Sequence, residues 1–498
     1  MTVAPPAAPA PTFARRHAAL LLGGAGRVSG VDVARGIAVL GMFAAHVGYT
    51  RDPVTGAENW LAVAHGRSSI LFALVAGVSL AIVSGGRTPL DGLPALQVRT
   101  RVLVRAVLLL GLVGLLDLLG TRVLLILGFY AAYFVLALPF LRWSPGRLAV
   151  AAGAFALGGP VLAYYGPEVL ARAGLRLPED GSGALTDFLV SGHYPAAVWM
   201  AYVLAGLAIG RLDLTSTAVR VALVGGGLLA TLVAYGISAA VVEPLGGTPA
   251  VEDAAAAWSS TLRPEPLGWD DPWPTSVYLW LAGPHTDTLL EVVGSGGFAV
   301  AVLGLCLFAG RVGRWVLAPL AAVGAMALTV YSAQIVVLWA WGEEAYEQTT
   351  NGPLLVLVLV TLAAATAWRW AFGRGPLERL FASVAGRASW GRAAARRRAR
   401  GRPGRPPRSS RRRRLRTSPG PARAPSPALR RPRRAPTRRR APARAAPPRG
   451  TRRARPRSRR RRRLRTRGPP PRRRDRARPR RRAGRARTRS GRARTSRR

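Results

Sequence analysis

Long apolar segments, separated by short polar connections, recur through the first 387 residues of this 498-residue chain. A helical crossing of the bilayer core needs about 20 apolar residues, with roughly 17–25 as the working range. Segments of this kind predict ten membrane spans, near residues 31–49, 70–84, 106–119, 123–141, 148–165, 196–210, 221–242, 289–310, 315–341 and 353–372. The second is short unless residues 61–64 extend it across His65 and Arg67. Because backbone inside lipid has to satisfy its own hydrogen bonds, the segments are expected to be helices and the fold an all-α transmembrane bundle.

Arginine placement predicts how this bundle is oriented, since cytoplasmic loops of membrane proteins keep an excess of positive residues. If the N-terminal side is cytoplasmic, the connections on that side carry most of the arginines and the opposite connections carry most of the acids. The cytoplasmic connections then include Arg87, Arg99, Arg101, Arg105, Arg142, Arg147, Arg211 and Arg220. The alternation predicts an even number of spans, both termini in the cytoplasm, and a multi-pass protein of the cell membrane whose first partner is the lipid bilayer.

Composition divides the chain into three predicted regions. Residues 1–30 are expected to be a flexible cytoplasmic extension, and residues 31–387 form the transmembrane domain. Residues 388–498 hold 49 arginines and a single acid, and so carry almost all of the formal net charge of +50. This last region has hardly any large apolar residue, and a segment that cannot bury apolar surface is expected to be disordered.

The arginine-rich region has two explanations. One is an electrostatic arm that binds anionic lipid or nucleic acid. Against it, no aromatic residue follows Trp390, and the whole chain contains no lysine. Arg, Pro, Ala and Gly are also the residues that a very GC-rich gene yields in a wrong reading frame. We therefore favour a frame-shifted C-terminus over an evolved arm, and we expect no nucleic-acid partner.

Four of the five histidines lie at the predicted outer ends of spans, namely His46, His65, His193 and His285. Histidine is the side chain most easily placed for proton transfer near neutral pH. Four histidines on one face predict an outward-facing acid–base site. Taken singly, each histidine is also explained as an interfacial hydrogen-bonding residue.

A second polar group lies on the predicted cytoplasmic side. Asp32 and Arg35 open the first span and share a helix face, because they are three residues apart. They are explained as an internal ion pair at the membrane boundary. Together with Arg99, Arg101 and Arg105, Arg35 is also a candidate to hold an anionic, phosphate-bearing donor. Contact with anionic lipid would explain the last three arginines equally well.

Polar groups inside spans are costly and mark candidate pathways. The candidates for a substrate path are Asp32, Arg67, Asp117, His193, Tyr331 and Gln334. Arg122 follows Asp117 closely and is its candidate partner, whereas interhelical hydrogen bonding is the ordinary alternative for the rest. No Cys/His spacing predicts a metal site, and the lone Cys306 is expected to be a packing residue.

Several short motifs resemble a known family. VDVARGIA at 31–38, followed by Gly41 and Met42, resembles the opening of the heparan-alpha-glucosaminide N-acetyltransferase-like membrane proteins. HGRSSILF at 65–72 resembles the second span of related bacterial proteins of unknown function. PHTDT at 284–288, GAMALTVY at 324–331 and GPLE at 375–378 are similar to later landmarks of that group. The resemblance covers roughly residues 27–387.

The resemblance implies a transmembrane acyltransferase. Acetyl-CoA or another acyl-CoA would be the co-substrate and would bind from the cytoplasmic side. The candidates to favour its binding are Arg35, Arg99, Arg101 and Arg105. The acyl group would reach an envelope sugar or glycan on the outer side, with His46, His65 or His285 as base or transient acyl carrier. Where the family places a histidine shortly before the second span, this chain has Glu58, Asn59 and Trp60, and His46 and His65 flank the position.

The rival prediction is a non-enzymatic transporter or channel that uses the same polar groups as a pathway. Nothing in the sequence indicates the oligomeric state.

Overall fold

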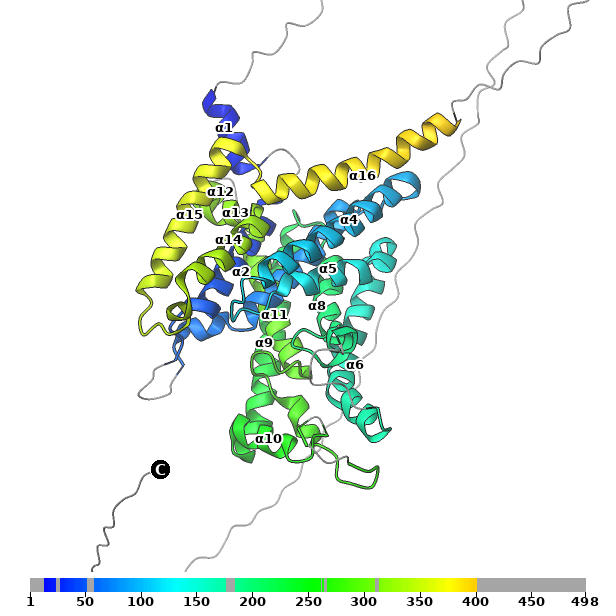
Figure 1. Cartoon of the computed structure of the whole chain (residues 1–498), viewed down its shortest axis with the longest axis vertical. Helices are drawn as coiled ribbons and strands as arrows, with labels where there is room; N and C mark the ends of the chain where they lie inside the picture. The colour runs from blue at the N-terminus through cyan, green and yellow to red at the C-terminus, as the bar shows by residue number, and fades with distance from the viewer. Residues whose placement is uncertain are drawn as a thin grey trace, which may run out of the picture. The chain divides into compact units, whose positions relative to one another are not determined.

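The computed structural model describes residues 13–23, 27–51, 58–175, 184–260, 262–263, 267–309 and 313–400, all within the unit Met1–Pro406. Within these ranges the chain forms helices and no strand. In the N-terminal half they are α1 (Phe13–Leu22), α2 (Ser29–Val47), η1 (Trp60–Ala64), α3 (Arg67–Val83), α4 (Gly92–Asp117), α5 (Ile126–Leu136), η2 (Leu138–Arg142), α6 (Pro145–Arg172), α7 (Ala184–Thr186), η3 (Asp187–Ser191), α8 (Ala196–Ile209) and α9 (Thr217–Val242). In the C-terminal half they are η4 (Glu243–Leu245), α10 (Gly247–Ala256), η5 (Ser276–Trp280), α11 (Leu289–Leu307), α12 (Gly313–Val316), α13 (Ala318–Ala325), α14 (Ala327–Trp341), η6 (Glu343–Tyr346), α15 (Gly352–Phe372) and α16 (Pro376–Arg400) (Figure 1).

Six helical segments of the described chain are long and apolar enough to cross a membrane. They are α2, η1 with α3, α6, α9 with η4, α11 and α15. The bent pair α13–α14 would make a seventh, and α5 and α8 are shorter apolar helices. The prediction of an all-helical membrane protein is confirmed. The span count of ten and the cytoplasmic location of both termini remain predictions.

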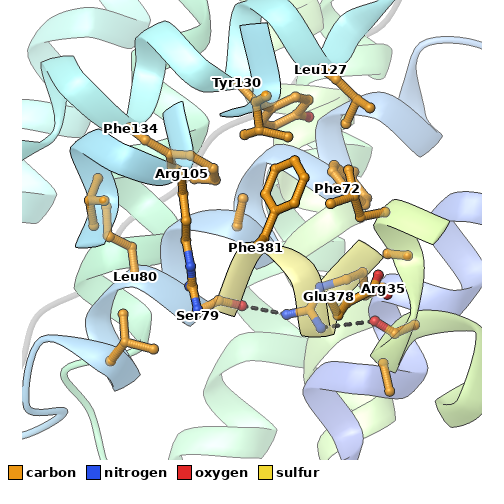
Figure 2. Close-up of a pocket in the computed structure, with 18 residues that line it drawn as sticks. Arg35, Phe72, Ser79, Leu80, Arg105, Leu127, Tyr130, Phe134, Glu378 and Phe381 are labelled. Atoms are coloured by element: carbon orange, nitrogen blue, oxygen red, sulfur yellow. Dashed lines mark hydrogen bonds between the residues drawn. The ribbon is translucent and has the colours of Figure 1, made fainter. Parts of the chain in front are cut away.

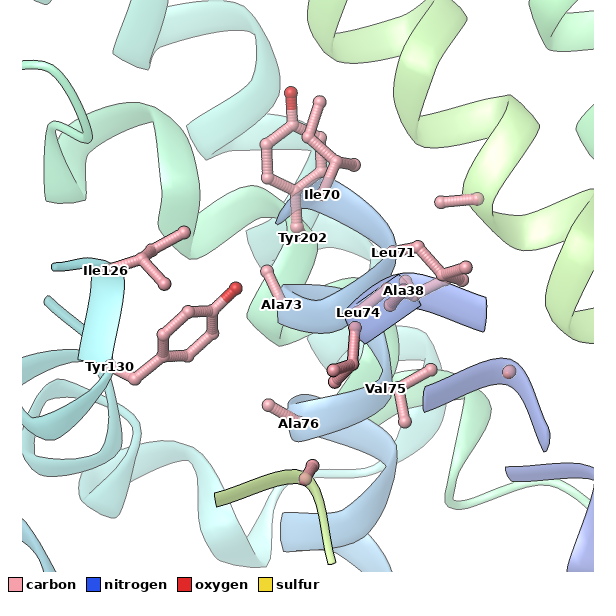
Figure 3. Close-up of a cluster of buried hydrophobic side chains, with 14 of the residues drawn as sticks. Ala38, Ile70, Leu71, Ala73, Leu74, Val75, Ala76, Ile126, Tyr130 and Tyr202 are labelled. Carbon is pink, nitrogen blue, oxygen red and sulfur yellow. The ribbon is translucent and has the colours of Figure 1, made fainter. Parts of the chain in front are cut away.

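Helix α3 is buried in the middle of the bundle. It is apolar around its whole circumference, which is typical of a helix that is covered on all sides. Figure 3 shows its side chains among Ala38, Tyr130 and Tyr202, which belong to α2, α5 and α8. Gly77 of α3 and Gly206 of α8 lie so close to the backbone of the opposite helix that a Cβ on either would collide with a carbonyl oxygen. Small residues therefore set the distance between these two helices.

The predicted span 315–341 is not one continuous helix, which corrects the sequence-based expectation. Helices α13 and α14 meet at an angle of 82° around Met326. The N-terminal turn of α14 is capped by Glu378 of α16, which accepts hydrogen bonds from the Thr329 backbone N–H at 3.1 Å and from the Thr329 hydroxyl at 2.6 Å. A carboxylate at this position compensates the free N–H groups and the positive end of the helix dipole.

Helix α16 lies along α4 (Figure 1). The Arg101 guanidinium donates to the Ser389 hydroxyl at 3.1 Å, which ties the two helices together. Helix α16 begins at Pro376 and runs through the predicted boundary at residue 387 to Arg400. The rest of the predicted tail, residues 401–498, lies outside the described residues. Helix α1, inside the predicted extension 1–30, contacts α15.

Arg172 of α6 binds the acid- and Trp-rich segment that lies between α9 and α11. Arg172 pairs with Glu168 at 2.5 Å and donates to the carbonyls of Gly268 and Pro272 at 2.7 and 2.9 Å. The indole of Trp273 lies 4.1 Å from the guanidinium carbon. Both members of the ion pair are buried, so this contact fixes the segment over the end of the bundle where His285 lies.

Candidate functional site

A cavity of about 300 Å³ opens beside the break between α13 and α14. We call it the arginine cavity, because Arg35 of α2 and Arg105 of α4 both line it. Its other lining residues are Phe72, Ala76, Ser79, Leu80, Val83, Val102, Leu109, Leu127, Tyr130, Phe134, Gly324, Ala325, Ala327, Leu328, Glu378 and Phe381. In Figure 2 the polar groups of Arg35, Ser79 and Glu378 lie along the lower edge, and aromatic rings form the upper wall. The cavity is thus apolar on most sides and cationic at one edge.

Arg35 is held by a network that reaches three helices. Its guanidinium donates to the Asp32 carboxylate at 3.1 Å, to the Gly324 carbonyl at 3.0 Å and to the Ser79 hydroxyl. Arg27 binds the same carboxylate, so two guanidinium groups share one acid. The predicted ion pair between Asp32 and Arg35 is present, and the network as a whole keeps one excess positive charge.

Arg99 and Arg101 do not line this cavity. Both precede Arg105 on α4, and Arg101 instead bonds to Ser389. The structure therefore brings two of the four predicted donor-binding arginines together. Glu378, from the motif GPLE at 375–378, also lines the cavity, and no role had been predicted for it. Its capping of α14 depends on a helix break that the apolar pattern does not reveal.

A second cavity of about 320 Å³ lies between α6, the η3 turn, η5 and the N-terminus of α11. We call it the histidine cavity, because His193 and His285 both line it. Their rings stack at a centroid distance of 4.8 Å and an interplanar angle of 30°. Asp287, Thr286, Ser191 and the rings of Tyr164 and Tyr278 also line it. Imidazole, carboxyl and hydroxyl groups thus meet in one place.

His65 lies next to this cavity, whereas His46 does not line it. The turn at Gly66 packs against Pro284, because a Cβ at Gly66 would lie 3.2 Å from the Pro284 Cβ. His65 is close enough to His285 for the two rings to interact electrostatically. His46 faces α14 instead, where its Nδ1 lies 3.2 Å from the Gln334 amide nitrogen. Three of the four predicted histidines are brought together.

Burial shapes the proton chemistry of the histidine cavity. The pKa of His285 is lowered to about 4, mainly by burial and in smaller part by the neighbouring His193 and His65. Burial also raises the pKa of Asp287 well above its usual value, helped by the nearby Glu291 and opposed by a hydrogen bond from the Trp199 indole at 3.0 Å. At neutral pH the site therefore offers a neutral imidazole, able to accept a proton, beside a carboxyl group whose raised pKa favours its protonated form.

Asp287 and Glu291 were missed as site residues. Asp287 was part of the motif at 284–288 without a role of its own, and Glu291 lies inside the predicted span 289–310 and was assigned no role. The signal that could have found Glu291 is the spacing Thr288-Leu289-Leu290-Glu291, since a Thr followed three positions later by Glu is typical of a helix start. Thr288 is indeed the N-cap of α11, and its hydroxyl accepts from the Glu291 N–H at 3.2 Å.

The remaining predicted path residues are scattered. Arg67 donates to the Tyr235 hydroxyl at 3.0 Å, and Tyr331 is buried in α14 outside both cavities. Asp117 is exposed at the end of α4, and Arg122 pairs with Glu343 rather than with Asp117. Among the described residues the ion pair of Arg122 is thus with Glu343 and not with its candidate partner Asp117.

A row of tyrosines joins the two cavities. Tyr130 lines the arginine cavity, and its ring meets that of Tyr133 edge-on at 5.7 Å. The Tyr133 hydroxyl donates to the Tyr194 carbonyl at 2.6 Å. The Tyr194 ring in turn contacts the rings of His193 and His285 at 4.8 and 5.7 Å. Contacts between aromatic residues of α5 and of the segment just before α8 thus link the linings of the two cavities.

Among the described residues, no three His, Cys, Asp or Glu side chains lie close enough together to hold a metal ion. Cys306 is buried in α11, as expected of a packing residue.

Two family models match the chain. Residues 27–236 match the catalytic domain of heparan-alpha-glucosaminide N-acetyltransferase. Residues 273–387 match a protein family of unknown function, DUF418. No curated protein matches the chain. Each cavity draws residues from both matched stretches, and together the two stretches cover most of the chain. The chain is therefore similar to the heparan-alpha-glucosaminide N-acetyltransferase-like membrane proteins over residues 27–236 and to the DUF418 family over residues 273–387, which matches the resemblance seen in the sequence motifs.

Proposed function

We propose that this protein is a membrane acyltransferase. It would move an acyl group, such as acetyl, from a coenzyme A thioester at the arginine cavity to a sugar or glycan at the histidine cavity. The observation that carries the proposal is the pairing of two chemically different cavities near opposite ends of the buried helix α3. The family match favours this enzyme function over a transporter or channel.

The arginine cavity has the chemistry to hold the donor. Guanidinium groups bind phosphate through paired hydrogen bonds, and Arg35 and Arg105 lie at the cavity edge. The apolar wall suits the uncharged arm and acyl group of the thioester. Arg99 and Arg101 lie farther along α4, where they would meet the more distant phosphates of the same donor. Following the arginine bias of the loops, this cavity would face the cytoplasm.

The histidine cavity has the chemistry to activate the acceptor. A neutral His285 takes the proton from the acceptor hydroxyl or amine as that atom attacks the thioester carbonyl carbon. The new C–O or C–N bond forms as the C–S bond breaks, and the coenzyme A sulfur leaves as a thiol after gaining a proton. The histidine that has taken the acceptor's proton is the group that can return it to the sulfur, and Asp287, whose pKa burial raises, lies beside it. His65 or His46 would serve as a transient acyl carrier in the two-step form of the reaction.

The acyl group has to pass the tyrosine row. Gly66, the N-cap of α3, packs near the histidine cavity, and Ser79 of the same helix lines the arginine cavity; at 1.5 Å per residue they lie roughly 20 Å apart. We infer that the donor arm extends along Tyr130 toward the histidines, or that a histidine carries the acyl group over the last part. Gln334 and Tyr331, on the neighbouring α14, would orient His46 and close that side of the route.

The test uses purified full-length protein with acetyl-CoA labelled in the acetyl group and D-glucosamine as an amino-sugar probe. We expect label to leave coenzyme A in the wild type, and Arg105→Gln to raise KM for acetyl-CoA several-fold. Arg147→Gln, an exposed arginine on α6, is the matched control and should leave KM unchanged. Absence of any transfer of label to protein, water or sugar would overturn the proposal, as would equal KM values in both variants.

A further inference from the structure

The loop that carries His285 has an unusual backbone. His285 has a φ of 62° and Asp287 a φ of 51°, a left-handed region that residues with side chains seldom adopt. Both residues line the histidine cavity. Residues held in such conformations persist only where surrounding contacts fix them, and they gather at functional sites.

Glu291 supplies those contacts. One carboxyl oxygen accepts from the His285 backbone N–H at 2.7 Å. The other accepts from the Asp287 backbone N–H at 2.7 Å and from the Thr286 hydroxyl at 3.2 Å. Glu291 is only 2% exposed. Both left-handed residues therefore donate their backbone N–H groups to this buried carboxyl group.

Helix capping alone does not explain this arrangement. In a capping box, the side chain of the third helical residue returns to the N–H of the N-cap residue. Here the N-cap is Thr288, and the Glu291 carboxyl group reaches past it to the two loop residues. The side chain is thus used to hold the loop rather than the helix end.

The turn that carries His65 packs on the same carboxyl group. Gly66 has a φ of 66°, and a Cβ there would lie 3.4 Å from a Glu291 oxygen. Glu291 therefore lies where two histidine-bearing segments meet. The titratable and charged groups that face His285 are His65, His193, Tyr194, Asp287 and Glu291.

We propose that Glu291 is a positioning residue that fixes the loop 284–288, so that His285 and Asp287 face the histidine cavity and the ring of His193. The inference rests on the proposed function for what the cavity does, but the placement of His285 is tested without any acyl transfer.

The test is carbethoxylation of His285 by diethylpyrocarbonate, followed residue by residue with mass spectrometry on the full-length protein in detergent. The reagent attacks neutral imidazole, so its rate against pH reports both access and pKa. Wild-type His285 should react at a nearly constant rate down to about pH 5, because burial lowers its pKa to about 4. In Glu291→Gln the amide replaces one acceptor oxygen by a donor, so one loop N–H loses its partner.

We expect the released loop of Glu291→Gln to react severalfold faster at His285, with an inflection near the ordinary histidine pKa of about 6.5. His17, on α1, is the internal reference and should not change. A rate and pH profile equal to those of the wild type would overturn the inference. If Glu291→Gln does not fold, Glu291→Asp carries the same test, because it keeps both acceptor oxygens but withdraws them by one methylene group.

An activity measurement accompanies the labelling. Small misplacement of a reacting group costs roughly 100-fold in rate, so kcat for acetyl transfer should fall at least tenfold in Glu291→Gln while KM for acetyl-CoA stays within about threefold. Glu344→Gln, an exposed acid in η6, is the matched control. If the wild type transfers no acetyl group, the proposed function fails, while the labelling result still decides whether Glu291 positions His285.

Discussion

His285 combines a strained backbone, a stacked imidazole partner and a pKa shift in one residue. Its ring stacks on His193 at 4.8 Å, and burial keeps it neutral down to about pH 4. The arginine bias of the loops was enough to predict that these histidines share one face of the membrane. It could not show that His46 turns toward Gln334 instead, because that choice depends on which helix packs beside α2.

Removal of the imidazole tests the role of His285 directly. In His285→Ala the acceptor loses its proton-accepting group, and general-base catalysis typically contributes 100-fold to 10,000-fold. We therefore expect kcat for acetyl transfer to fall by roughly 100-fold or more, measured with labelled acetyl-CoA. His17→Ala should keep full activity. Activity of His285→Ala within about threefold of the wild type would exclude this residue as the base.

The low pKa of His285 predicts an unusual pH dependence. Since the folded pKa of about 4 lies below the ordinary value near 6.5, the folded protein binds fewer protons than the unfolded chain within this window. The free energy of unfolding therefore falls as the pH drops from about 6.5 toward 4, while His285 of the folded protein keeps its neutral, proton-accepting form. We expect kcat/KM with a hydroxyl acceptor to hold to about pH 5. A decline centred near pH 6.5, without loss of fold, would contradict this.

At the scale of elements, the break between α13 and α14 shapes the arginine cavity. Residues from both sides of the break, Gly324 and Leu328, line it, and Glu378 caps the new helix end. The sequence predicted one span over 315–341 because its apolar pattern is unbroken there. The carboxylate that caps the new helix end comes from α16, 49 residues away in the chain, so no local pattern could reveal this contact.

The crossing of α13 with α2 depends on two glycines. A Cβ on Gly324 would collide with the Asp32 carbonyl oxygen, and one on Gly36 with the Leu320 carbonyl oxygen. Gly324→Ala is expected to separate the helices and to lower stability by roughly 1–3 kcal/mol, the usual cost of overpacking. The measurement is the thermal unfolding midpoint in detergent.

Gly111→Ala is the matched control for that substitution. Gly111 lies inside α4 with nothing within 4 Å of its would-be Cβ, so alanine there should be neutral or slightly stabilising. Equal unfolding midpoints for the two variants would contradict close contact at the α2–α13 crossing.

At the scale of the whole molecule, sequence and structure agree on a helical membrane protein that is similar to an N-acetyltransferase catalytic domain over residues 27–236 and to DUF418 over residues 273–387. The apolar segments and the short motifs were sufficient for that, since both are local features. The pairing of the two cavities could not be predicted from the sequence, because one cavity joins α2, α4 and α16 and the other joins the η3 turn, η5 and the loop before α11. Asp287 was missed because its neighbours come from distant segments, whereas Glu291 had the local signal described above.

The arginine-rich tail predicts a clear result on truncation. Helix α16 extends to Arg400, and Ser389 receives a hydrogen bond from Arg101. A chain that ends after Arg400 should keep the unfolding midpoint and the acetyl-transfer rate of the full chain. A chain that ends after Arg387 loses the contact with Arg101 and should unfold at a lower temperature. Loss of activity in the chain that ends after Arg400 would show that the tail takes part in function.

The central claim is that donor and acceptor meet the protein on opposite sides of the membrane. It is tested most directly in sealed proteoliposomes, with labelled acetyl-CoA on one side and D-glucosamine only on the other. Orientation is read with an impermeant maleimide on a cysteine placed at Arg147. We predict acetylated sugar only when acetyl-CoA is on the side of Arg147, and none from His285→Ala. Equal transfer when both substrates are confined to the same side, or none in either arrangement, would contradict the account.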